Sequence, residues 1–342
     1  MFEIWAAVLR RGGNLFVDPE IPPANYYAYT PVWAVLLRVY DLIATASGTP
    51  MHFVLRAALT LADVGNACLI GVIAHRASGW SWHRGFATYF LNPVSILLVG
   101  FHGQVEPLAA LPLLGAIVLS RAGAAAVHRR AEWLLGTASL VLKHNLAFLV
   151  WTLYWFAFPP LARVVALGLS AVVFAATFLP YLIVSPGAVI HNVLGHAGLP
   201  GLYGFSSFAP LWICVPLFFI VMTSLPLAAQ AWGLDVPRAM RLSAIAFMAF
   251  TYGIGEQYFV IPILFGAALG GRWFWGYTAA VSLFLLSSFE NVNILPLPRV
   301  WNAVWVVALA WTASEVISAV RIKINPGIEG AIRSRVEPPE PD

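Results

Sequence analysis

Charged residues and cysteines are scarce in this sequence. Asp, Glu, Lys and Arg make up only 10% of its 342 residues, whereas 60% are hydrophobic and the mean hydropathy is +0.81. Soluble domains carry about a quarter charged residues, so this composition excludes an ordinary soluble protein and indicates a membrane protein with several spans. The two cysteines, Cys68 and Cys214, lie in apolar runs, which excludes a disulfide framework and a CxxC metal site.

Several functional signatures are also missing. The N-terminus has no basic segment followed by a short apolar core and a cleavage site, as a signal peptide would have. No GxSxG, HExxH, P-loop or dinucleotide motif occurs. His191 and His196 have no evident third ligand, so we expect no zinc site there; no cofactor is indicated with certainty, and use of a divalent metal stays open without a supporting ligand set. No repeat of fixed period supports an inverted-repeat transporter.

Apolar runs of spanning length, by contrast, are abundant. A bilayer requires about 20 mostly apolar residues per helix, and we therefore predict an all-α polytopic membrane fold with about 10–11 transmembrane or partly spanning helices. The predicted spans are 53–74, 85–100, 106–121, 131–142, 144–158, 164–184, 207–231, 239–253, 257–270, 273–289 and 300–320. Those on either side of Lys143 and Gly255 are short, so we expect shortened or broken helices facing a cavity there.

Arginine and lysine gather in alternate loops and in the C-terminal tail. Examples are Arg76, Arg129 and Arg238, whereas the loops between them hold only Lys143 and Arg299 as strong bases. The positive-inside rule places the arginine-rich loops in the cytoplasm. All of the unusual polar residues then fall on the outer face.

This topology divides the chain into three units. Residues 1–52 form an extracytoplasmic first loop, residues 53–320 the transmembrane domain, and residues 321–342 a cytoplasmic tail. His102, His196 and Glu290 are predicted to face outward.

The first unit contains one segment that looks like a span, NYYAYTPVWAVLLRVYDLIATA. Arg38 and Asp41 interrupt it, and counting it as a crossing would reverse the charge asymmetry. We therefore predict an interfacial helix with Arg38 reaching back to the surface; a tilted true span is the alternative. The aromatic residues expected at headgroup level are Tyr26, Tyr27, Tyr29 and Trp33.

Three polar side chains stand close together in GFHGQVEP, between two apolar runs. His102 and Glu106 are four residues apart and share one face if helical, with Gln104 on the neighbouring face. Pro107 suits the first turn of a helix, where the Glu106 carboxylate meets the positive end of the helix dipole. One interpretation is a polar cap. The other is a binding site, because ionisable groups at membrane depth are costly and usually mark function.

Two further polar breaks interrupt apolar helices. In SLVLKHN, Lys143 and His144 are flanked by apolar residues, and the alternative to a site is a lysine that snorkels to the surface. In GIGEQYFVIP, Glu256, Gln257 and Tyr258 form the second break, for which the alternative is a glycine-rich kink.

Polar residues from three separate outer loops, one of them a lysine suited to phosphate, indicate an anionic lipid-linked ligand that enters from the bilayer. The long loop around His191, Asn192, His196 and Tyr203 is rich in glycine and proline and is a candidate lid.

The order of these motifs resembles the GT-C superfamily of polytopic glycosyltransferases, which use polyprenyl- or dolichyl-phosphate sugars. The resemblance is carried by YAYTPVW (27–33), LNPVSILLVGFHGQVEP (91–107), SLVLKHN (139–145) and GIGEQYFVIP (253–262) and covers nearly the whole chain. It implies a hexosyltransferase of the glucosyl- and mannosyltransferase type, in the plasma membrane of a bacterium or archaeon, acting on the extracytoplasmic face with inversion. Its partners are the lipid-linked donor, a glycan or lipid acceptor and membrane lipids, with no nucleic acid.

The resemblance also implies roles for individual residues. Lys143 holds the donor phosphate. The residues that bind substrate or line the cavity are Tyr29, His102, Gln104, His144, Glu256, Gln257 and Tyr258. The Asp that serves such enzymes as base belongs before Met1, so we expect the chain to lack the first helix and its Asp, with Glu106 as the candidate catalytic carboxylate.

Two other classes of function are alternatives. A flippase or transporter of a lipid-linked sugar would spread polar residues across the membrane depth. A non-catalytic, truncated membrane subunit would agree with a missing Asp.

Overall fold

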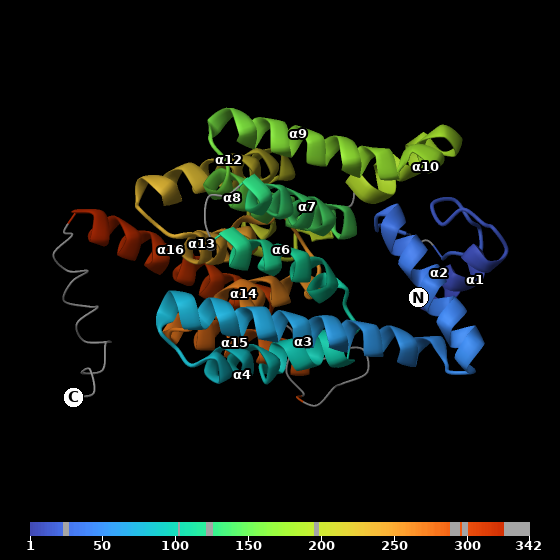
Figure 1. The fold of residues 1–342 in the computed structure, drawn as a ribbon, viewed down its shortest axis with the longest axis horizontal. Coiled ribbons are helices and arrows are strands. Elements are labelled where there is room, and N and C mark those ends of the chain that lie inside the picture. The colour runs from blue at the N-terminus through green and yellow to red at the C-terminus, as the bar shows by residue number, and fades with distance from the viewer. Residues whose placement is uncertain are drawn as a thin grey trace.

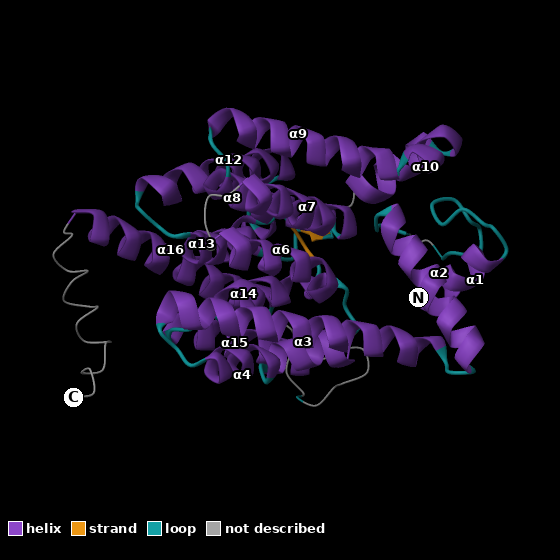
Figure 2. Cartoon of the chain, viewed as in Figure 1, coloured by secondary structure: helices purple, strands orange, loops and turns teal. Residues whose placement is uncertain are grey.

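The structure is a computed structural model that describes residues 1–22, 27–101, 103–120, 126–194, 198–287, 295 and 300–324. Its described residues are almost entirely helical, with one short pair of strands near the middle (Figure 2). The predicted fold class is confirmed: the chain is an all-α polytopic membrane protein. Within the described ranges, four helices are long and apolar enough to cross a bilayer.

Helix follows helix along the described chain. The helices of the first half are α1 (Phe2–Arg10), α2 (Pro31–Ser47), α3 (Met51–Ser78), α4 (Trp82–Phe90), α5 (Pro93–Ser95), the π-helix η2 (Ile96–Phe101), α6 (Glu106–Ser120), α7 (Ala126–Leu142), the 3₁₀ turn η3 (His144–Leu146), α8 (Ala147–Ala157) and α9 (Pro160–Thr177). Those that follow are α10 (Leu179–Val184), α11 (Pro186–Val189), the π-helix η4 (Ile190–Leu194), the 3₁₀ turn η5 (Gly204–Ser207), α12 (Leu211–Ala231), α13 (Val236–Phe250), the 3₁₀ turn η6 (Glu256–Phe259), α14 (Val260–Gly266), α15 (Arg272–Leu286) and α16 (Trp301–Ile324). The strands are β1 (Leu199–Pro200) and β2 (Gly253–Ile254).

Short polar and glycine signals set many of these boundaries. Helices α2 and α3 end at Gly48 and Gly79, both in the left-handed conformation that glycine adopts at low cost. Ser81 and Asp235 cap the N-termini of α4 and α13 by accepting hydrogen bonds from backbone amides three residues on. Most predicted spans agree with the observed helices within a few residues, but the span 85–100 is divided between α4, α5 and η2, and the span 257–270 between η6 and the short helix α14.

The predicted helix breaks are present. An extended residue, Lys143, separates α7 from η3 and α8, and the segment around Gly255 separates α13 from α14. Helix α14 is only seven residues long, about half the length that a typical globular helix would have. Both breaks place polar residues inside the helical bundle rather than at its surface.

The spanning helices run along the long axis of the molecule, with α1 and α2 gathered at one end (Figure 1). Helix α6 defines the two ends. It begins at Glu106, and near its other end Arg76 donates to the carbonyl of Val118, 3.1 Å away. Twelve residues of α-helix separate these levels by about 18 Å. We call the two ends of the bundle the Glu106 end and the Arg76 end.

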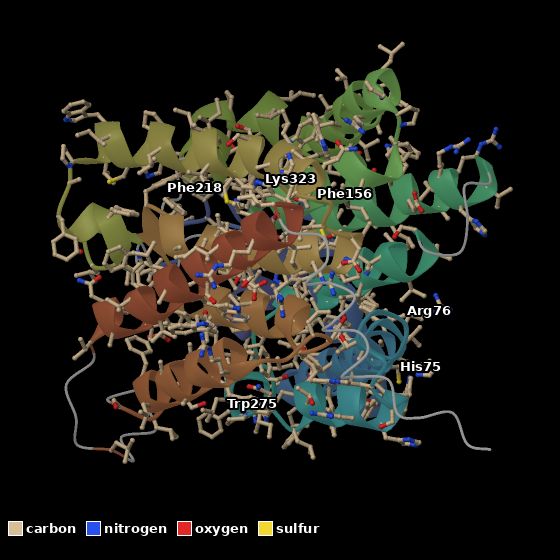
Figure 3. The ribbon with its side chains drawn as sticks, turned by 90° about the vertical axis from the view of Figure 1, so that its left-hand side faces the viewer. His75, Arg76, Phe156, Phe218, Trp275 and Lys323 are labelled. Carbon is tan, nitrogen blue, oxygen red and sulfur yellow. The ribbon has the colours of Figure 1, made fainter. Side chains whose placement is uncertain are left out.

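Basic residues mark the Arg76 end. His75 and Arg76 lie in the last turn of α3, and Arg321 and Lys323 in the last turn of α16. Figure 3, which looks onto the side opposite α1 and α2, shows His75, Arg76 and Lys323 near this face. The asymmetry of charge seen in the sequence is therefore also an asymmetry between the two ends of the fold.

A small second core covers the Glu106 end. Helix α1 packs on α2, and their aromatic residues form a cluster that also includes Phe178 and Val193 from the later part of the chain. Tyr27 and Trp33, which were predicted to lie at headgroup level, are fully buried in this cluster and pack on protein. Tyr26 lies outside the described residues. The rings pack edge to face on one another and form a separate apolar core for the first unit.

Asp41 ties this first unit together. Its carboxylate is buried and contacts Arg38 at 2.6 Å and Arg10, on α1, at 3.1 Å. Arg38, which was predicted to reach back to the membrane surface, is partly exposed and pairs with Asp41 three residues along its own helix. The charges that interrupt this apolar segment therefore have a structural use, which is to fasten α1 to α2.

Candidate functional site

Two charged side chains meet in the interior of the Glu106 end. The ammonium of Lys143 lies 3.1 Å from a carboxylate oxygen of Glu106. Glu106 is completely buried, and Lys143 retains only 6% of its exposure. An ion pair this deep carries a large desolvation cost, so it is weak evidence for added stability and stronger evidence for a site. The snorkelling interpretation of Lys143 is wrong, because the ammonium is held inside the protein.

Two tyrosines complete this group. The Lys143 ammonium sits 4.0 Å from the centre of the Tyr29 ring, a cation–π contact. Tyr258, also buried, is within electrostatic range of both Lys143 and Glu106. The four residues come from four of the motifs singled out in the sequence, so the fold brings those distant motifs to one point. We call Tyr29, Glu106, Lys143 and Tyr258 the buried quartet.

Local backbone features place the charged pair. Gly103 adopts a positive φ of 71°, which turns the chain out of η2 and into α6. Glu106 then occupies the first turn of α6, followed by Pro107, where the positive end of the helix dipole favours a carboxylate. Lys143 is extended, with φ −151° and ψ 107°, so its side chain leaves the line of α7 and points into the bundle.

Tyr29 is positioned by the first unit. The Tyr27 hydroxyl donates to the carbonyl of Thr30 at 2.6 Å, and Thr30 in turn donates to the carbonyl of Leu142 at 3.4 Å. Leu142 is the residue before Lys143. The backbone around Tyr29 is thereby attached to the break that carries the lysine.

Several buried polar atoms around the pair have no hydrogen-bond partner among the described residues. They include both carboxylate oxygens of Glu106, the hydroxyl of Ser139 and both amide atoms of Asn145. Ser139 lies one turn before Lys143, and its carbonyl accepts from the Lys143 amide at 2.9 Å. Native interiors leave few such groups, so this concentration indicates a place prepared for a polar ligand or water.

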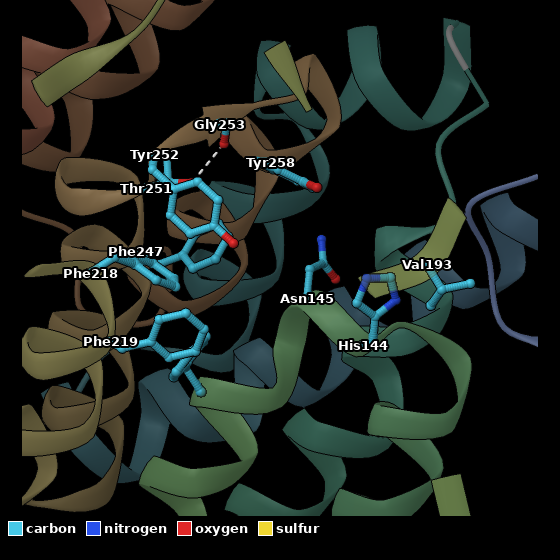
Figure 4. A pocket seen from close by; sticks show the side chains of 11 residues that line it. His144, Asn145, Val193, Phe218, Phe219, Phe247, Thr251, Tyr252, Gly253 and Tyr258 are labelled. Atoms are coloured by element: carbon cyan, nitrogen blue, oxygen red, sulfur yellow. Dashed lines mark hydrogen bonds between the residues drawn. The ribbon is translucent and has the colours of Figure 1, made fainter. Parts of the chain in front are cut away.

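A cavity of about 180 Å³ lies beside the quartet. Asn145 and Tyr258 extend toward the same space from different segments, and His144 and Val193 border it from the other side (Figure 4). The residues that line it are His144, Asn145, Phe148, Val193, Phe218, Phe219, Phe247, Thr251, Tyr252, Gly253 and Tyr258. Rings dominate this wall and polar groups are few, the usual composition of a small-molecule site.

The long loop after α10 is fixed over this region. Strand β1 pairs antiparallel with β2, with Leu199 opposite Ile254 and Pro200 opposite Gly253. Farther back, Asn192 donates to the carbonyl of Phe16 at 3.3 Å. Tyr203 is fully buried and its ring contacts Phe259. The predicted lid is thus attached at both of its described ends; His196 lies outside the described residues.

The other predicted site residues are distributed as follows. His144 lines the cavity. Gln104, Glu256 and Gln257 are partly buried and lie within two residues of Glu106 or Tyr258 in the sequence, but they do not line the cavity. His102 lies outside the described residues. The glycine-rich kink offered as an alternative for residues 253–258 is partly right, because Gly253 pairs in β2 while Tyr258 joins the quartet.

Sequence reasoning missed a buried carboxylate in α3. Asp63, in the middle of α3, accepts hydrogen bonds from Tyr89 and, at 3.0 Å, from Ser95. One turn on, Asn66 donates to the carbonyl of Pro107 at 2.8 Å, directly next to Glu106. A lone Asp within an apolar span was the available signal, since such residues usually have a partner and a purpose. The rings of the cavity gave no comparable signal, because phenylalanine is ordinary in such helices.

Within the described ranges, no group of three or more His, Cys, Asp or Glu side chains is close enough to hold a metal ion. No family model, curated protein or solved structure matches the sequence. The site must therefore be interpreted from its own chemistry.

Proposed function

We propose that the protein is a membrane glycosyltransferase that moves a hexose from a polyprenyl-phosphate donor to a hydroxyl acceptor. The observation that carries the proposal is the buried Glu106–Lys143 pair beside a ring-lined cavity. It supplies a cation for a phosphate and a carboxylate for a proton, in surroundings from which water is largely excluded. Fixed charges in such surroundings interact more strongly than they do in water.

The proposed reaction needs both charges. The acceptor oxygen attacks the anomeric carbon of the donor, and the bond from that carbon to the phosphate oxygen breaks with its electron pair on the phosphate. The hydroxyl proton passes to a carboxylate, for which we propose Glu106. Lys143 stabilises the negative charge that grows on the departing polyprenyl phosphate. Attack from the face opposite the leaving group inverts the anomeric centre.

The cavity suits one sugar ring. Its volume of about 180 Å³ is below the roughly 300–1,000 Å³ of common small-molecule sites, so it is too small for a whole lipid-linked donor. Phe148, Phe218 and Tyr252 line the cavity with aromatic rings, on which a sugar can stack, and Asn145 offers donors and an acceptor to its hydroxyls. The polyprenyl chain would remain in the lipid.

The distribution of charge supports an orientation. The Arg76 end carries the basic turns of α3 and α16, so we propose that this end faces the cytoplasm and that the buried quartet faces outward. We place the protein in the plasma membrane of a bacterium or archaeon. The donor would then reach the site laterally from the outer leaflet.

A donor comparison tests the proposal. Purified protein in lipid nanodiscs would be given labelled polyprenyl-phosphate hexose or labelled nucleotide hexose, together with a mixture of glycan and lipid acceptors. Release of polyprenyl phosphate and transfer of label from the lipid donor are expected. Transfer from the nucleotide sugar alone would reject the proposal, and movement of intact lipid donor across the bilayer without cleavage would favour a flippase.

A further inference from the structure

The Glu106–Lys143 pair is incompletely satisfied as a structural ion pair. The two side chains approach at 3.1 Å through a single carboxylate oxygen. Besides the Lys143 ammonium, no described residue forms a hydrogen bond with either Glu106 oxygen. A buried pair that is retained for stability needs further hydrogen bonds to offset the cost of removing two charges from water.

The surroundings of Lys143 provide unused capacity of a particular kind. The Ser139 hydroxyl, one turn earlier, and the Asn145 amide, two residues later, are both buried without a partner among the described residues. Both groups can donate hydrogen bonds. A cation with two neutral donors close to it in the chain is a suitable set for an oxyanion that has more than one free oxygen.

The Tyr29 ring holds the ammonium independently of Glu106. Its centre is 4.0 Å from the nitrogen, so Lys143 keeps one favourable contact when the carboxylate leaves. Glu106 likewise keeps a favourable position, since it stays in the first turn of α6. Each partner therefore has a second interaction, and the pair can separate without leaving either charge wholly unsupported.

We propose that this pair is the closed state of a site for lipid-linked phosphate, in which phosphate replaces Glu106 as the partner of Lys143. The inference rests on the proposed function and adds a sequence of events to it. The free protein keeps its cation neutralised by its own carboxylate. Arrival of the donor phosphate transfers Lys143 to the phosphate oxygens, and Glu106 is released as the proton acceptor only when the donor is in place.

This exchange protects the site before the donor arrives. A free carboxylate and a free ammonium at this depth would each draw in water, which is the competing acceptor for the activated sugar. The closed pair neutralises both charges until phosphate supplies a better partner for Lys143. After transfer the product phosphate leaves, Glu106 loses its proton to solvent and the pair closes again.

Equilibrium binding distinguishes the exchange from a merely structural pair. Farnesyl phosphate serves as the probe, inorganic phosphate as the lipid-free anion and farnesol as the lipid without the anion, each titrated into protein in nanodiscs. Glu106→Gln removes the competing charge and keeps the shape, so it should bind farnesyl phosphate about 10-fold more tightly than wild type. Lys143→Met should lose most phosphate-dependent binding. Farnesol should bind all three proteins alike.

The inorganic phosphate arm identifies the source of the anion. A gain for farnesyl phosphate with little binding of inorganic phosphate supports a lipid-linked ligand. Equal binding of inorganic phosphate would overturn that part of the proposal.

A second variant covers the case in which Glu106→Gln does not fold. Glu106→Asp withdraws the carboxylate while keeping its charge, and its affinity for farnesyl phosphate should lie between those of wild type and Glu106→Gln. If neither variant, or the only one that folds, binds more tightly than wild type, the pair is structural and the exchange is rejected. If the affinities follow the expected order but no sugar is transferred from the lipid donor, the exchange stands and the proposed function fails.

Discussion

The ammonium of Lys143 contacts the Glu106 carboxylate on one side and the Tyr29 ring on the other, at 3.1 Å and 4.0 Å. Tyr29 precedes α2, Glu106 begins α6, and Lys143 separates α7 from η3. No two of them are neighbours in the chain: the packing of α6 on α7 brings Glu106 to Lys143, and the packing of the first unit on the bundle adds Tyr29. A substitution of any one of the three should therefore change the electrostatic surroundings of the other two.

The ring of Tyr29 gives the first prediction. Tyr29→Phe keeps the face that attracts the ammonium, whereas Tyr29→Leu keeps only apolar volume. A desolvated cation–π contact contributes about 2 kcal/mol, so the leucine variant should bind farnesyl phosphate at least several-fold more weakly. The phenylalanine variant should stay within about 2-fold of wild type. Calorimetric titration measures both, and equal losses would show that the hydroxyl matters rather than the ring.

The strand pair over the site gives a second prediction, through two glycines. Gly198 and Gly201 both have positive φ, at 65° and 81°. A methyl group on Gly198 would lie 2.6 Å from the carbonyl oxygen of Ile254, whereas on Gly201 its nearest neighbour is 4.0 Å away. Gly201→Ala should therefore cost only the left-handed backbone penalty of about 1–2 kcal/mol. Gly198→Ala should cost more, because β1 must also move off β2.

Limited proteolysis and thermal unfolding of the two glycine variants provide the measurement. We expect faster cleavage between residues 190 and 210 in Gly198→Ala than in Gly201→Ala. Equal melting temperatures and equal cleavage would mean that the strand pair does not hold this loop in solution.

The helical architecture was predictable because its signals are local. Apolar runs fix the spans, and breaks such as those at Lys143 and Gly255 follow from polar or flexible residues within them. The alternation of arginine-rich and arginine-poor loops indicated which loops lie together at each end of the bundle. None of these inferences requires knowledge of which helix packs against which.

The contacts within the site were not predictable, because they depend on packing. The sequence indicated that Glu106 and Lys143 belong to one site, but the register between α6 and α7 decides that they touch. The burial of Tyr27 and Trp33 was not predictable, because the pattern of an amphipathic helix does not show that α1 packs against α2. Asp63 was overlooked because its partners, Tyr89 and Ser95, come from other helices.

The partners of Asp63 give a third prediction. Tyr89 and Tyr203 are both fully buried tyrosines, but only the Tyr89 hydroxyl has a hydrogen-bond partner among the described residues. Tyr89→Phe should destabilise the protein by about 1–3 kcal/mol, because it removes a donor from a buried carboxylate. Tyr203→Phe should be neutral or slightly stabilising, since it removes a buried hydroxyl that forms no hydrogen bond with the described residues. Thermal unfolding in detergent compares them; a larger loss at Tyr203 would contradict the assignment.

A fourth prediction concerns orientation in the membrane. In a background with Cys68→Ala and Cys214→Ala, single cysteines replace Val17, an exposed residue of the first unit, and Arg129, near the start of α7. The positive-inside rule predicts that an impermeant maleimide labels position 17 in intact cells and position 129 only after permeabilisation. Labelling of position 129 from outside would reverse the orientation and place the quartet at the cytoplasmic side.

The last prediction separates the fold from the chemistry by exchanging the two charges. Glu106→Lys alone buries two ammonium groups together, and Lys143→Glu alone buries two carboxylates. Each single change should cost about 3–5 kcal/mol, because it leaves like charges without a partner in the interior. The double variant Glu106→Lys/Lys143→Glu restores an opposite pair and should recover most of the melting temperature.

Recovery of the fold should not bring recovery of function. In the double variant a carboxylate faces the Tyr29 ring, whose π face carries partial negative charge and repels it. The ammonium now lies on α6, away from the Ser139 and Asn145 donors that flank position 143, so phosphate finds no matching set of partners. We expect farnesyl phosphate binding and sugar transfer to stay below about 1% of wild type, a loss of roughly 3 kcal/mol. If the exchanged pair instead restored binding along with stability, charge neutralisation alone would be its role, and the directed arrangement of lysine, ring and donors would carry no chemistry.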